Sequence, residues 1–332
     1  MKCFYGQTSN SSSNFGAALN RWLWPQLGPQ MFEGQKLLEA EGDASGHSSG
    51  HSSGHSFGHS TGASTVFVGA GTLLNQKTID QTSPAAKLVI FGTGVGYEPS
   101  LKAVPISWDI RCLRGPLSAQ RLGLPASKAI TDSGLLIAQV FEASSVRSGC
   151  SFMPQVDHAS LAADSWQRIC QQAGVRYIDP RWPVEKILRL IASSDRLLSE
   201  SLYGAIAADA LRIPWLPIVS SPRIYSFKWQ DWCMSLNLFY HPYRLPALKG
   251  YSRYNQSLQS TRHWLETILE GPISTYQYEL LADESAIAHR LANIAKQVPS
   301  LSTEAVFTQK LDALQNGFAQ FCQQYMRDRV MH

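Results

Sequence analysis

Short apolar runs that end in glycine turns are the feature that most constrains the fold of this chain. Thr65 to Val68 runs into Gly69-Ala70-Gly71, and Leu88 to Phe91 runs into Gly92-Thr93-Gly94-Val95-Gly96. Short runs rich in valine, isoleucine and phenylalanine are typical of buried strands. Because such runs alternate with helical patterns along this chain, the sequence predicts an α/β fold with parallel sheets.

The pattern restarts after a break in composition, so two domains are expected. Residues 141–149 are rich in Ala and Ser. Beyond them Asp164 to Ala173 is predicted as a helix, and Arg196 to Glu200 as a strand that leads to Gly204. The 332 residues of the chain also exceed the roughly 250–300 that one hydrophobic core usually serves. We therefore expect two Rossmann-type domains, over residues 1–143 and 150–300.

Residues 301–332 are predicted to contribute an amphipathic helix that packs on the body of the protein. Their apolar side chains recur at alternating steps of four and three residues, which places them on one face of a helix. These side chains are Phe307, Leu311, Leu314, Phe318 and Phe321.

Composition excludes several classes of protein. Hydrophobic residues make up 44% and charged residues 16% of the chain, a balance that excludes wholesale disorder. The net charge of +4 is spread without a Lys/Arg block, so no nucleic-acid partner is expected. Six cysteines without a CxxC pair favour reduced thiols in the cytoplasm. No run approaches the roughly 20 apolar residues of a membrane span, and we expect a cytoplasmic protein.

A histidine tract lies between residues 46 and 62, where the sequence GHSS-GHSS-GHSF-GHST repeats with a period of four. Histidine-rich tracts can bind metal ions. The density of Gly and Ser disfavours the helix that would align the imidazoles of His47, His51, His55 and His59. A flexible surface insertion is therefore the favoured interpretation, with metal binding as the alternative, and no metal is expected in the functional site.

Three glycine turns are candidate anion sites. In open α/β sheets, ligands bind at the carboxyl ends of strands, where free N–H groups begin a helix. The turns are Gly92 to Gly96, Arg114-Gly115-Pro116 and Ser201 to Gly204. Gly92-x-Gly94-x-Gly96 is not the dinucleotide spacing GxGxxG, which argues against a nicotinamide enzyme. Spacing alone leaves ordinary chain reversal open for all three turns.

Several longer segments resemble the polysaccharide pyruvyltransferase family, bacterial exopolysaccharide branch. Residues 199–215, SESLYGAIAADALRIPW, are similar to its pattern E-x-x-H-G-A-I-x-A-D-A-L-R-V-P-W. Further segments follow the family's order from about residue 14 to about residue 232. They are NFG at 14–16, FVGAGTLLN at 67–75, RGPLSA at 114–119, LGL at 122–124, TD at 131–132, SFMP at 151–154 and FKWQDW at 227–232.

The resemblance implies a GT-B-like fold, with two parallel sheets facing each other across a cleft. It also implies a reaction that joins the pyruvyl unit of phosphoenolpyruvate to two hydroxyls of a sugar as a cyclic ketal. Phosphoenolpyruvate would be a co-substrate, and no other cofactor is expected. The glycan partner would be a terminal hexose of an exopolysaccharide repeat, lipid-linked at the inner face of the cytoplasmic membrane. The N-terminal domain would hold the acceptor and the C-terminal domain the donor.

This chemistry needs a general acid, a base for the hydroxyls and donors for phosphate and carboxylate. The candidate residues form three sets. Catalytic roles fall to His158, Asp157, Glu200 and Tyr203, donor binding to Arg114, Ser201, Gly204 and Lys228, and acceptor binding to Asn14, Gly16, Trp229 and Trp232. Asp132 is a second base or a helix cap, and core packing stays an alternative for both tryptophans.

Three departures from the family pattern bear on activity. Tyr203 stands where the family has histidine, Ala17 and Ala18 stand where it has two aspartates, and Gln155 stands where it has histidine after Pro154. An inactive relative that binds glycans or partner proteins is therefore the alternative, and a glycosyltransferase using a nucleotide sugar is a weaker one.

Overall fold

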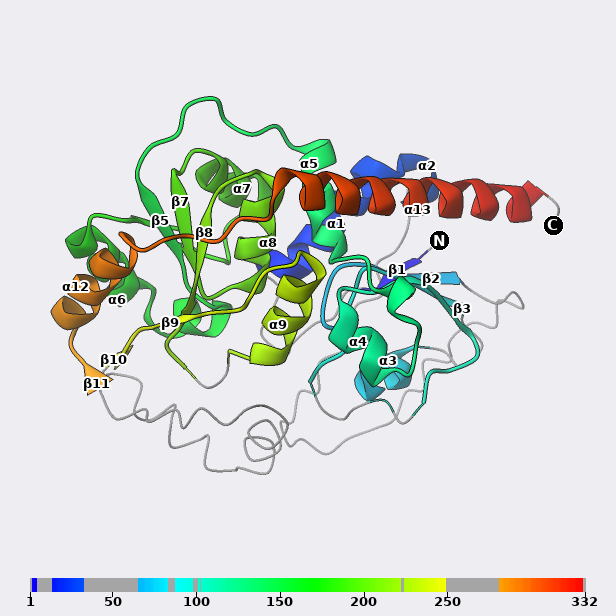
Figure 1. Cartoon of the computed structure of the whole chain (residues 1–332), viewed down its shortest axis with the longest axis horizontal. Coiled ribbons are helices and arrows are strands. Elements are labelled where there is room, and N and C mark those ends of the chain that lie inside the picture. Colours follow the sequence, from blue (N-terminus) through cyan, green and yellow to red (C-terminus); the bar gives the residue numbers. More distant parts are fainter. Residues whose placement is uncertain are drawn as a thin grey trace, which may run out of the picture.

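The computed structural model describes residues 2–4, 14–32, 65–82, 87–97, 101, 103–221, 224–248 and 281–330. The histidine tract, including His47, His51, His55 and His59, lies outside them. Within the described residues the chain forms two lobes, each built on a parallel sheet, and one long helix runs across both (Figure 1). We call them the N-terminal lobe and the C-terminal lobe.

The N-terminal lobe has a parallel sheet in the order β1-β2-β3-β4 among the described strands. Apolar side chains of β2 and β3 are buried on both faces, as in a sheet covered by helices. The predicted strand at Thr65 is confirmed, and Pro116 begins a helix as predicted. The elements are β1 (Lys2–Phe4), α1 (Phe15–Leu27), α2 (Pro29–Phe32), β2 (Thr65–Val68), α3 (Gln76–Gln81), β3 (Lys87–Phe91), β4 (Trp108–Cys112), α4 (Pro116–Arg121), η1 (Ala126–Lys128), η2 (Ser133–Leu136) and α5 (Ile137–Val140).

The C-terminal lobe has a parallel sheet in the order β6-β5-β7-β8-β9. This is a doubly wound order, in which the chain leaves β5 toward one edge and returns on its other side at β7. The elements are β5 (Cys150–Met153), α6 (Val156–Ala173), β6 (Arg176–Tyr177), α7 (Val184–Ala192), β7 (Arg196–Ser199), α8 (Leu202–Ala210), β8 (Trp215–Val219), α9 (Ser226–Ser235), β9 (Tyr243–Arg244), β10 (Ala247–Leu248), β11 (Leu281–Ala282) and α12 (Glu284–Ile294). Strand β10 pairs in parallel with β11.

Helix α6 extends further toward its N-terminus than the sequence predicts. The helical pattern was expected from Asp164, but the helix begins at Val156 and is kinked at Ala162, where φ is −152°. The added first segment places Asp157 and His158 in the opening turn of a helix. Both residues therefore lie just beyond the carboxyl end of β5.

The C-terminal helix α13 (Glu304–Val330) is the predicted amphipathic helix, and it packs mainly on the N-terminal lobe. The ring centroid of Phe318 lies 5.5 Å from that of Trp24 and 5.7 Å from that of Phe91. Phe321 stacks on Phe67 at 5.6 Å. In Figure 1 the helix starts beside the C-terminal lobe and ends beyond the N-terminal one. It therefore joins the two lobes covalently and by packing.

The two lobes share one apolar core. A single cluster of buried side chains contains Phe67 of the N-terminal sheet, Trp215 of the C-terminal sheet and Phe318 of α13. The Phe15 N–H at the start of α1 also donates to Pro180 O of the other lobe at 2.8 Å. The lobes are therefore in direct contact along their boundary, so the facing sheets are separated there by packed side chains.

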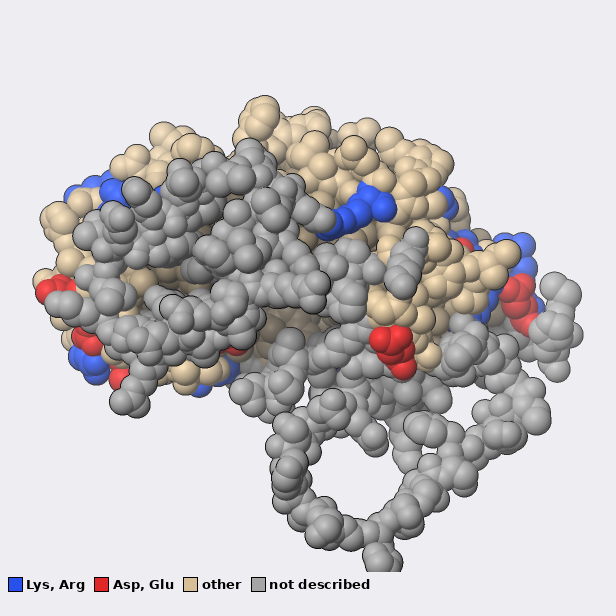
Figure 2. Space-filling view, turned by 90° about the horizontal axis from the view of Figure 1, so that it is seen from below, with Lys and Arg blue, Asp and Glu red and all other residues tan. Residues whose placement is uncertain are grey.

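The surface of the described residues shows no concentration of basic side chains on the face seen in Figure 2, where Lys and Arg are scattered. None of the described helices combines the length and apolarity that crossing a bilayer requires. All six cysteines lie in the described segments and are free thiols.

Candidate active site

The candidate site lies at the carboxyl ends of β5 and β7, where the strand order of the C-terminal sheet reverses. In doubly wound sheets this switch point opens the crevice in which ligands bind. Strand β5 leads into Gln155 and His158, and β7 leads into Glu200. Strand β8 ends next to Ser220. Three successive strands of the sheet thus bring their following side chains to one edge.

Glu200, His158 and Ser220 form a hydrogen-bonded network at this edge. His158 Nδ1 lies 2.8 Å from Glu200 Oε2, and Ser220 Oγ donates to Glu200 Oε1. The Gln155 N–H also donates to Oε2 of Glu200, at 3.0 Å. All three network side chains are at most 5% exposed. The predicted residues His158 and Glu200 are therefore brought together, and Ser220 joins them.

The network keeps Glu200 ionised. Burial opposes its charge, but the charge and hydrogen bond of His158, with hydrogen bonds from Ser220 and the Gln155 N–H, outweigh burial and lower the pKa of Glu200. An ionised carboxylate only accepts hydrogen bonds, so Nδ1 of His158 carries the proton between them. The carboxylate therefore fixes the orientation and tautomer of the imidazole.

One acceptor beside this network has no partner. Gln155 Oε1 is buried and makes no hydrogen bond within the described structure. Buried polar atoms are nearly always paired, and an exception calls for an explanation such as a missing ligand. A hydroxyl group bound at the switch point would satisfy it.

Tyr203 reaches from α8 to the N-terminal lobe. Its hydroxyl donates to Asp132 Oδ2 at 3.2 Å, and its ring packs on Gly16. A Cβ atom at Gly16 would lie 2.5 Å from Cδ2 of Tyr203, so glycine is required there. The two predicted site residues therefore meet, but Tyr203 occupies the space beside the start of α1.

Asp132 is a buried carboxyl group with a raised pKa. It is fully buried, and burial raises its pKa to about 7, against the opposing effects of the Gly134 N–H, Arg114 and Tyr203. Oδ1 of Asp132 accepts from the Gly134 N–H at 2.9 Å, so it also caps η2. Both sequence interpretations of Asp132, cap and acid–base group, are thus compatible with its surroundings.

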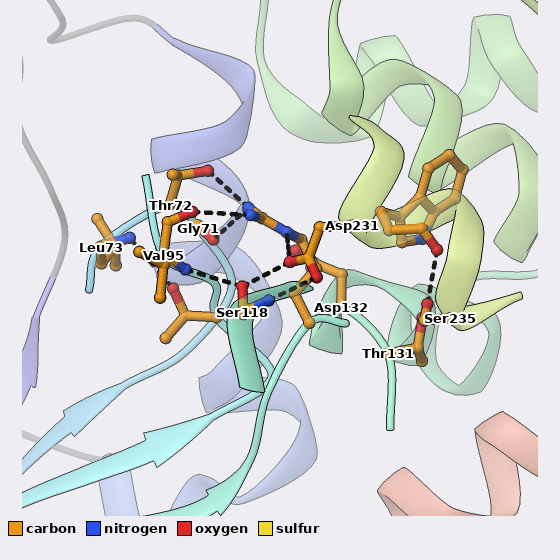
Figure 3. Close-up of polar contacts among 12 residues, drawn as sticks. Gly71, Thr72, Leu73, Val95, Ser118, Thr131, Asp132, Asp231 and Ser235 are labelled. Carbon is orange, nitrogen blue, oxygen red and sulfur yellow. Dashed lines mark hydrogen bonds and ion pairs between the residues drawn. The ribbon is translucent and has the colours of Figure 1, made fainter. Parts of the chain in front are cut away.

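Arg114 is held by the protein itself. Its side chain is 0% exposed. Nε donates to Asp231 Oδ2 at 2.9 Å, Nη1 to Thr72 Oγ1 at 2.7 Å and Nη2 to Val95 O at 3.0 Å. Figure 3 shows its partners Thr72, Val95 and Asp231 close together, with Ser118 between them. All three nitrogens of Arg114 are engaged within the protein, and these contacts do not support the prediction that Arg114 clamps the anionic donor.

At the start of α4, where a bound anion was expected, the structure has the carboxylate of Asp231. Asp231 Oδ1 accepts from the Ser118 N–H at 2.9 Å, and its Oδ2 accepts from Ser118 Oγ at 2.5 Å. The glycine turn from Gly92 to Gly96 makes room for the Arg114 side chain of the same ion pair, since a Cβ at Gly94 would overlap Arg114 Cζ. Two of the three predicted anion turns are therefore filled by the Arg114–Asp231 pair.

The third predicted turn is capped by its own serine. Ser201 Oγ accepts from the Gly204 N–H at 3.3 Å, as the N-cap of α8. A Cβ at Gly204 would lie 2.5 Å from Ser199 Oγ, so glycine lets α8 pack closely on β7. Asn14 likewise caps α1 by accepting from the Gly16 N–H at 3.1 Å. For Ser201, Gly204 and Asn14 the structure shows capping and packing contacts.

Trp229 and Trp232 are core residues, which corrects their assignment as a sugar-stacking surface. Both are 0% exposed, and their rings pack around Trp215, with Trp232 at 5.1 Å between centroids. A sugar can stack only on an accessible ring face. The aspartate between them, Asp231, holds Arg114, so this part of the motif serves packing.

The structure also places the two remaining predicted residues, Lys228 and Asp157. Lys228 donates from Nζ to the Tyr97 hydroxyl at 3.1 Å, at the boundary between the lobes. Asp157 lies in the first turn of α6, where a carboxylate interacts favourably with the helix dipole.

The end of the longest motif also has a structural role. Asp209 Oδ2 accepts from Trp215 Nε1 and from the Ser302 N–H, both at 3.0 Å. These bonds tie the end of α8 to β8 and to the segment before α13. A pocket of about 370 Å³ lies at this end of α8, lined by residues 138–143 and 210–212, and contains none of the candidate residues.

Ser220 is a site residue that was not predicted from the sequence. The signal that could have indicated Ser220 is the end of the apolar run Trp215–Val219, which forms the strand paired with β7. Adjacent parallel strands end at the same edge of the sheet, which brings Ser220 to Glu200. Nothing in the local sequence marks the aromatic pair Tyr97 and Tyr225, which stack at 5.5 Å although they are far apart in the chain.

Two parallel α/β lobes joined by a C-terminal helix, with polar networks at the carboxyl ends of their strands, define a GT-B-like protein. No protein-family model matches the chain. Succinoglycan biosynthesis protein ExoV of Rhizobium meliloti (strain 1021) is 34% identical over 268 residues, which are 80% of this chain and 73% of that protein. The chain belongs to the polysaccharide pyruvyltransferase family.

Two solved structures of the wall teichoic acid polymerase TagF are similar at low identity. One covers 100% of this chain and 89% of that chain, with 11% identity and a TM-score of 0.39. The other, with CDPG, covers 81% and 74%, with 12% identity and a TM-score of 0.35. These values describe a distant likeness in outline and carry no information on chemistry.

Proposed function

We propose that this protein transfers the pyruvyl group of phosphoenolpyruvate to a terminal hexose of an exopolysaccharide repeat, as a cyclic ketal. Family membership and the name of the relative, a succinoglycan biosynthesis protein, support the pathway class. The observation that carries the proposal is the His158–Glu200 pair at the switch point of the C-terminal sheet. It supplies an oriented proton carrier at the place where a ligand of such a sheet binds.

The reaction consists of one protonation, the addition of one hydroxyl and the displacement of phosphate by a second hydroxyl. A proton adds to the methylene carbon of phosphoenolpyruvate, which becomes a methyl group and leaves an oxocarbenium-like carbon. One sugar hydroxyl forms a C–O bond to this carbon and loses its proton. The second hydroxyl forms the other C–O bond as the bond to phosphate breaks. Two hydroxyl protons are released, so one replaces the proton consumed and the other leaves with inorganic phosphate.

In this scheme His158 delivers the proton, and Glu200 positions its ring and stabilises its cationic form. The buried Gln155 Oε1 accepts a hydrogen bond from a sugar hydroxyl. Asp132 is the second acid–base group, because its pKa of about 7 allows exchange in both directions near neutral pH. Asp132 and Tyr203 lie between the lobes, so this second role requires the acceptor to enter at that boundary.

The test is phosphate release and a ketal mass gain when the purified protein meets phosphoenolpyruvate and a panel of hexose-terminated glycans. His158→Gln and Glu200→Gln are expected to lower kcat by at least about a hundredfold. Glu185→Gln, at an exposed salt bridge on α7, is the matched control and keeps full activity. Unchanged kcat in both network variants would refute the assigned roles.

A second candidate is a non-catalytic relative that binds glycan or partner proteins. Tyr203 favours it, because a phenol replaces the family histidine and fills the space beside Gly16. The filled anion turns at Arg114 and Asp231 point the same way. Calorimetric titration with phosphoenolpyruvate separates the two candidates, since only a transferase must bind this donor. Gain of turnover in the triple variant Ala17→Asp, Ala18→Asp, Tyr203→His would show that only the catalytic groups were lost.

A further inference from the structure

An aromatic platform lies at the boundary between the lobes, outside the networks described above. It consists of Tyr97, which follows β3, and Tyr225 and Phe227 at the start of α9. Arg121 of α4 and Lys228 of α9 flank these rings. The N-terminal lobe thus supplies one tyrosine and the arginine, and the C-terminal lobe supplies the rest.

The three rings form a continuous stack. The centroids of Tyr97 and Tyr225 are 5.5 Å apart with an interplanar angle of 29°, and those of Tyr225 and Phe227 are 5.8 Å apart at 26°. The cations lie at the edges of the stack. Lys228 Nζ donates to the Tyr97 hydroxyl at 3.1 Å, and the Arg121 guanidinium lies 5.1 Å from the centre of the Phe227 ring.

Tyr97 is held in an unfavourable backbone conformation to reach this position. Its φ is +60°, a region that a bulky residue rarely adopts. Residues held in such conformations cluster at ligand sites, because the surrounding structure must stabilise them. The side chain is nevertheless 42% exposed, so core packing does not explain it. Gly96 before it, at φ +153°, lets the loop approach Tyr225, since a Cβ there would lie 2.8 Å from Tyr225 Cε1.

The platform is near the candidate active site. Ser220 of the Glu200 network and Tyr225 of the platform are five residues apart in the chain, which limits their Cα separation to about 18 Å. A hexose ring spans a few ångströms, so two or three linked sugar units bridge that distance. A glycan lying on the platform can therefore present its terminal sugar at the switch point.

We propose that the aromatic platform binds a sugar ring of the acceptor glycan, with Tyr97 as the stacking surface. The inference rests on the proposed transferase function. It assigns the acceptor subsite to the platform instead of to Trp229 and Trp232, which are buried. A pyranose ring has an apolar face of C–H groups that packs on an aromatic ring, and hydroxyls at its rim that accept hydrogen bonds. Lys228 and Arg121, which already contact the hydroxyls of Tyr97 and Tyr225, carry N–H donors for such rim hydroxyls. Because the stack crosses the lobe boundary, a bound glycan contacts both lobes.

The probes are methyl β-glucopyranoside and methyl β-galactopyranoside, titrated into the full-length protein and followed by saturation-transfer NMR. Tyr97→Gly removes the ring while its backbone conformation suits glycine, so the variant is expected to keep the wild-type Tm or exceed it. We expect its Kd for the preferred glycoside to rise about tenfold or more, the loss of about 1.4 kcal/mol of stacking. Tyr97→Phe retains the ring and is expected to stay within about threefold.

Phe239→Ala is the matched control, because this aromatic side chain is 93% exposed and outside the platform. Its Kd is expected to stay within about twofold of wild type.

Equal affinity of wild type and Tyr97→Gly, or no binding of either glycoside by the wild type, would overturn the proposal. The transferase function can fail separately from this proposal. If glycoside binding depends on Tyr97 but no phosphate is released, the platform proposal is supported and the transferase function is not. If the Tyr97→Gly variant turns over with an unchanged acceptor KM, the platform proposal is refuted.

Discussion

The hydroxyl of Tyr203 donates a hydrogen bond to Oδ2 of Asp132 at 3.2 Å, which ties the first turn of α8 to η2 of the other lobe. This bond lies at the position where the family has a histidine. The Tyr203 phenol, hydrogen-bonded to the Asp132 carboxyl group with its pKa of about 7, differs chemically from an imidazole at this position. The contact therefore bears on stability, on pH dependence and on whether the family's chemistry persists.

Asp132→Asn is expected to change how stability depends on pH. The folded pKa of about 7 lies above the ordinary aspartate value of 3.8, so folding retains a proton that the unfolded chain loses between these values. Stability of the wild type therefore falls as pH rises through this window, by about 1.4 kcal/mol per unit of pKa difference, and levels off above it. The variant lacks this component. Urea denaturation from about pH 4 to about pH 8 measures the difference, and parallel curves for both proteins would contradict the prediction.

Glu200→Gln is expected to act in the opposite pH range. The pKa of Glu200 is lowered in the fold, so its ionised form contributes stability above the unfolded pKa of about 4.3, and this contribution is lost as pH falls through the folded value. The wild type should therefore lose stability below about pH 4 more steeply than the variant. Acid titration followed by circular dichroism compares them, and a steeper loss in the variant would argue against an ionised Glu200.

Asp231→Ala is expected to destabilise the protein by about 3–5 kcal/mol, because it leaves the buried Arg114 charge without its partner. The comparison is Glu185→Ala, which breaks an exposed pair with Arg189 and should change stability by less than about 1 kcal/mol. Denaturant midpoints at neutral pH measure both. A small effect of Asp231→Ala would mean that another group or water satisfies Arg114.

Gly16→Ala is expected to cost about 1–3 kcal/mol, since its Cβ would meet the Tyr203 ring. In a Tyr203→Ala background the clash disappears, and alanine's better helix propensity should make the same change neutral or stabilising by up to about 1 kcal/mol. A double-mutant cycle by thermal unfolding measures the coupling. Additive effects would show that the two residues do not touch.

The sequence predicted much of the fold because the relevant signals are local. The apolar run at Thr65 to Val68 and the Pro116 helix start needed only neighbouring residues, and both appear as predicted. The same logic placed Glu200 at the end of a strand that leads to Gly204. The helix before Asp164 was missed because Val156 to Ala162 has no clear apolar stripe.

By itself, then, the sequence determined the α/β class, the family resemblance and the strand end that carries Glu200. Only the tertiary structure decided which groups occupy the predicted sites. Asp231 reaches Arg114 across 117 residues of sequence and occupies the start of α4 that an external anion was expected to take. Burial of Trp229 and Trp232 against Trp215, and the raised pKa of the buried Asp132, likewise arise from tertiary packing. Spacing along a chain specifies which groups share an element, whereas desolvation and partner choice depend on elements that meet only after folding.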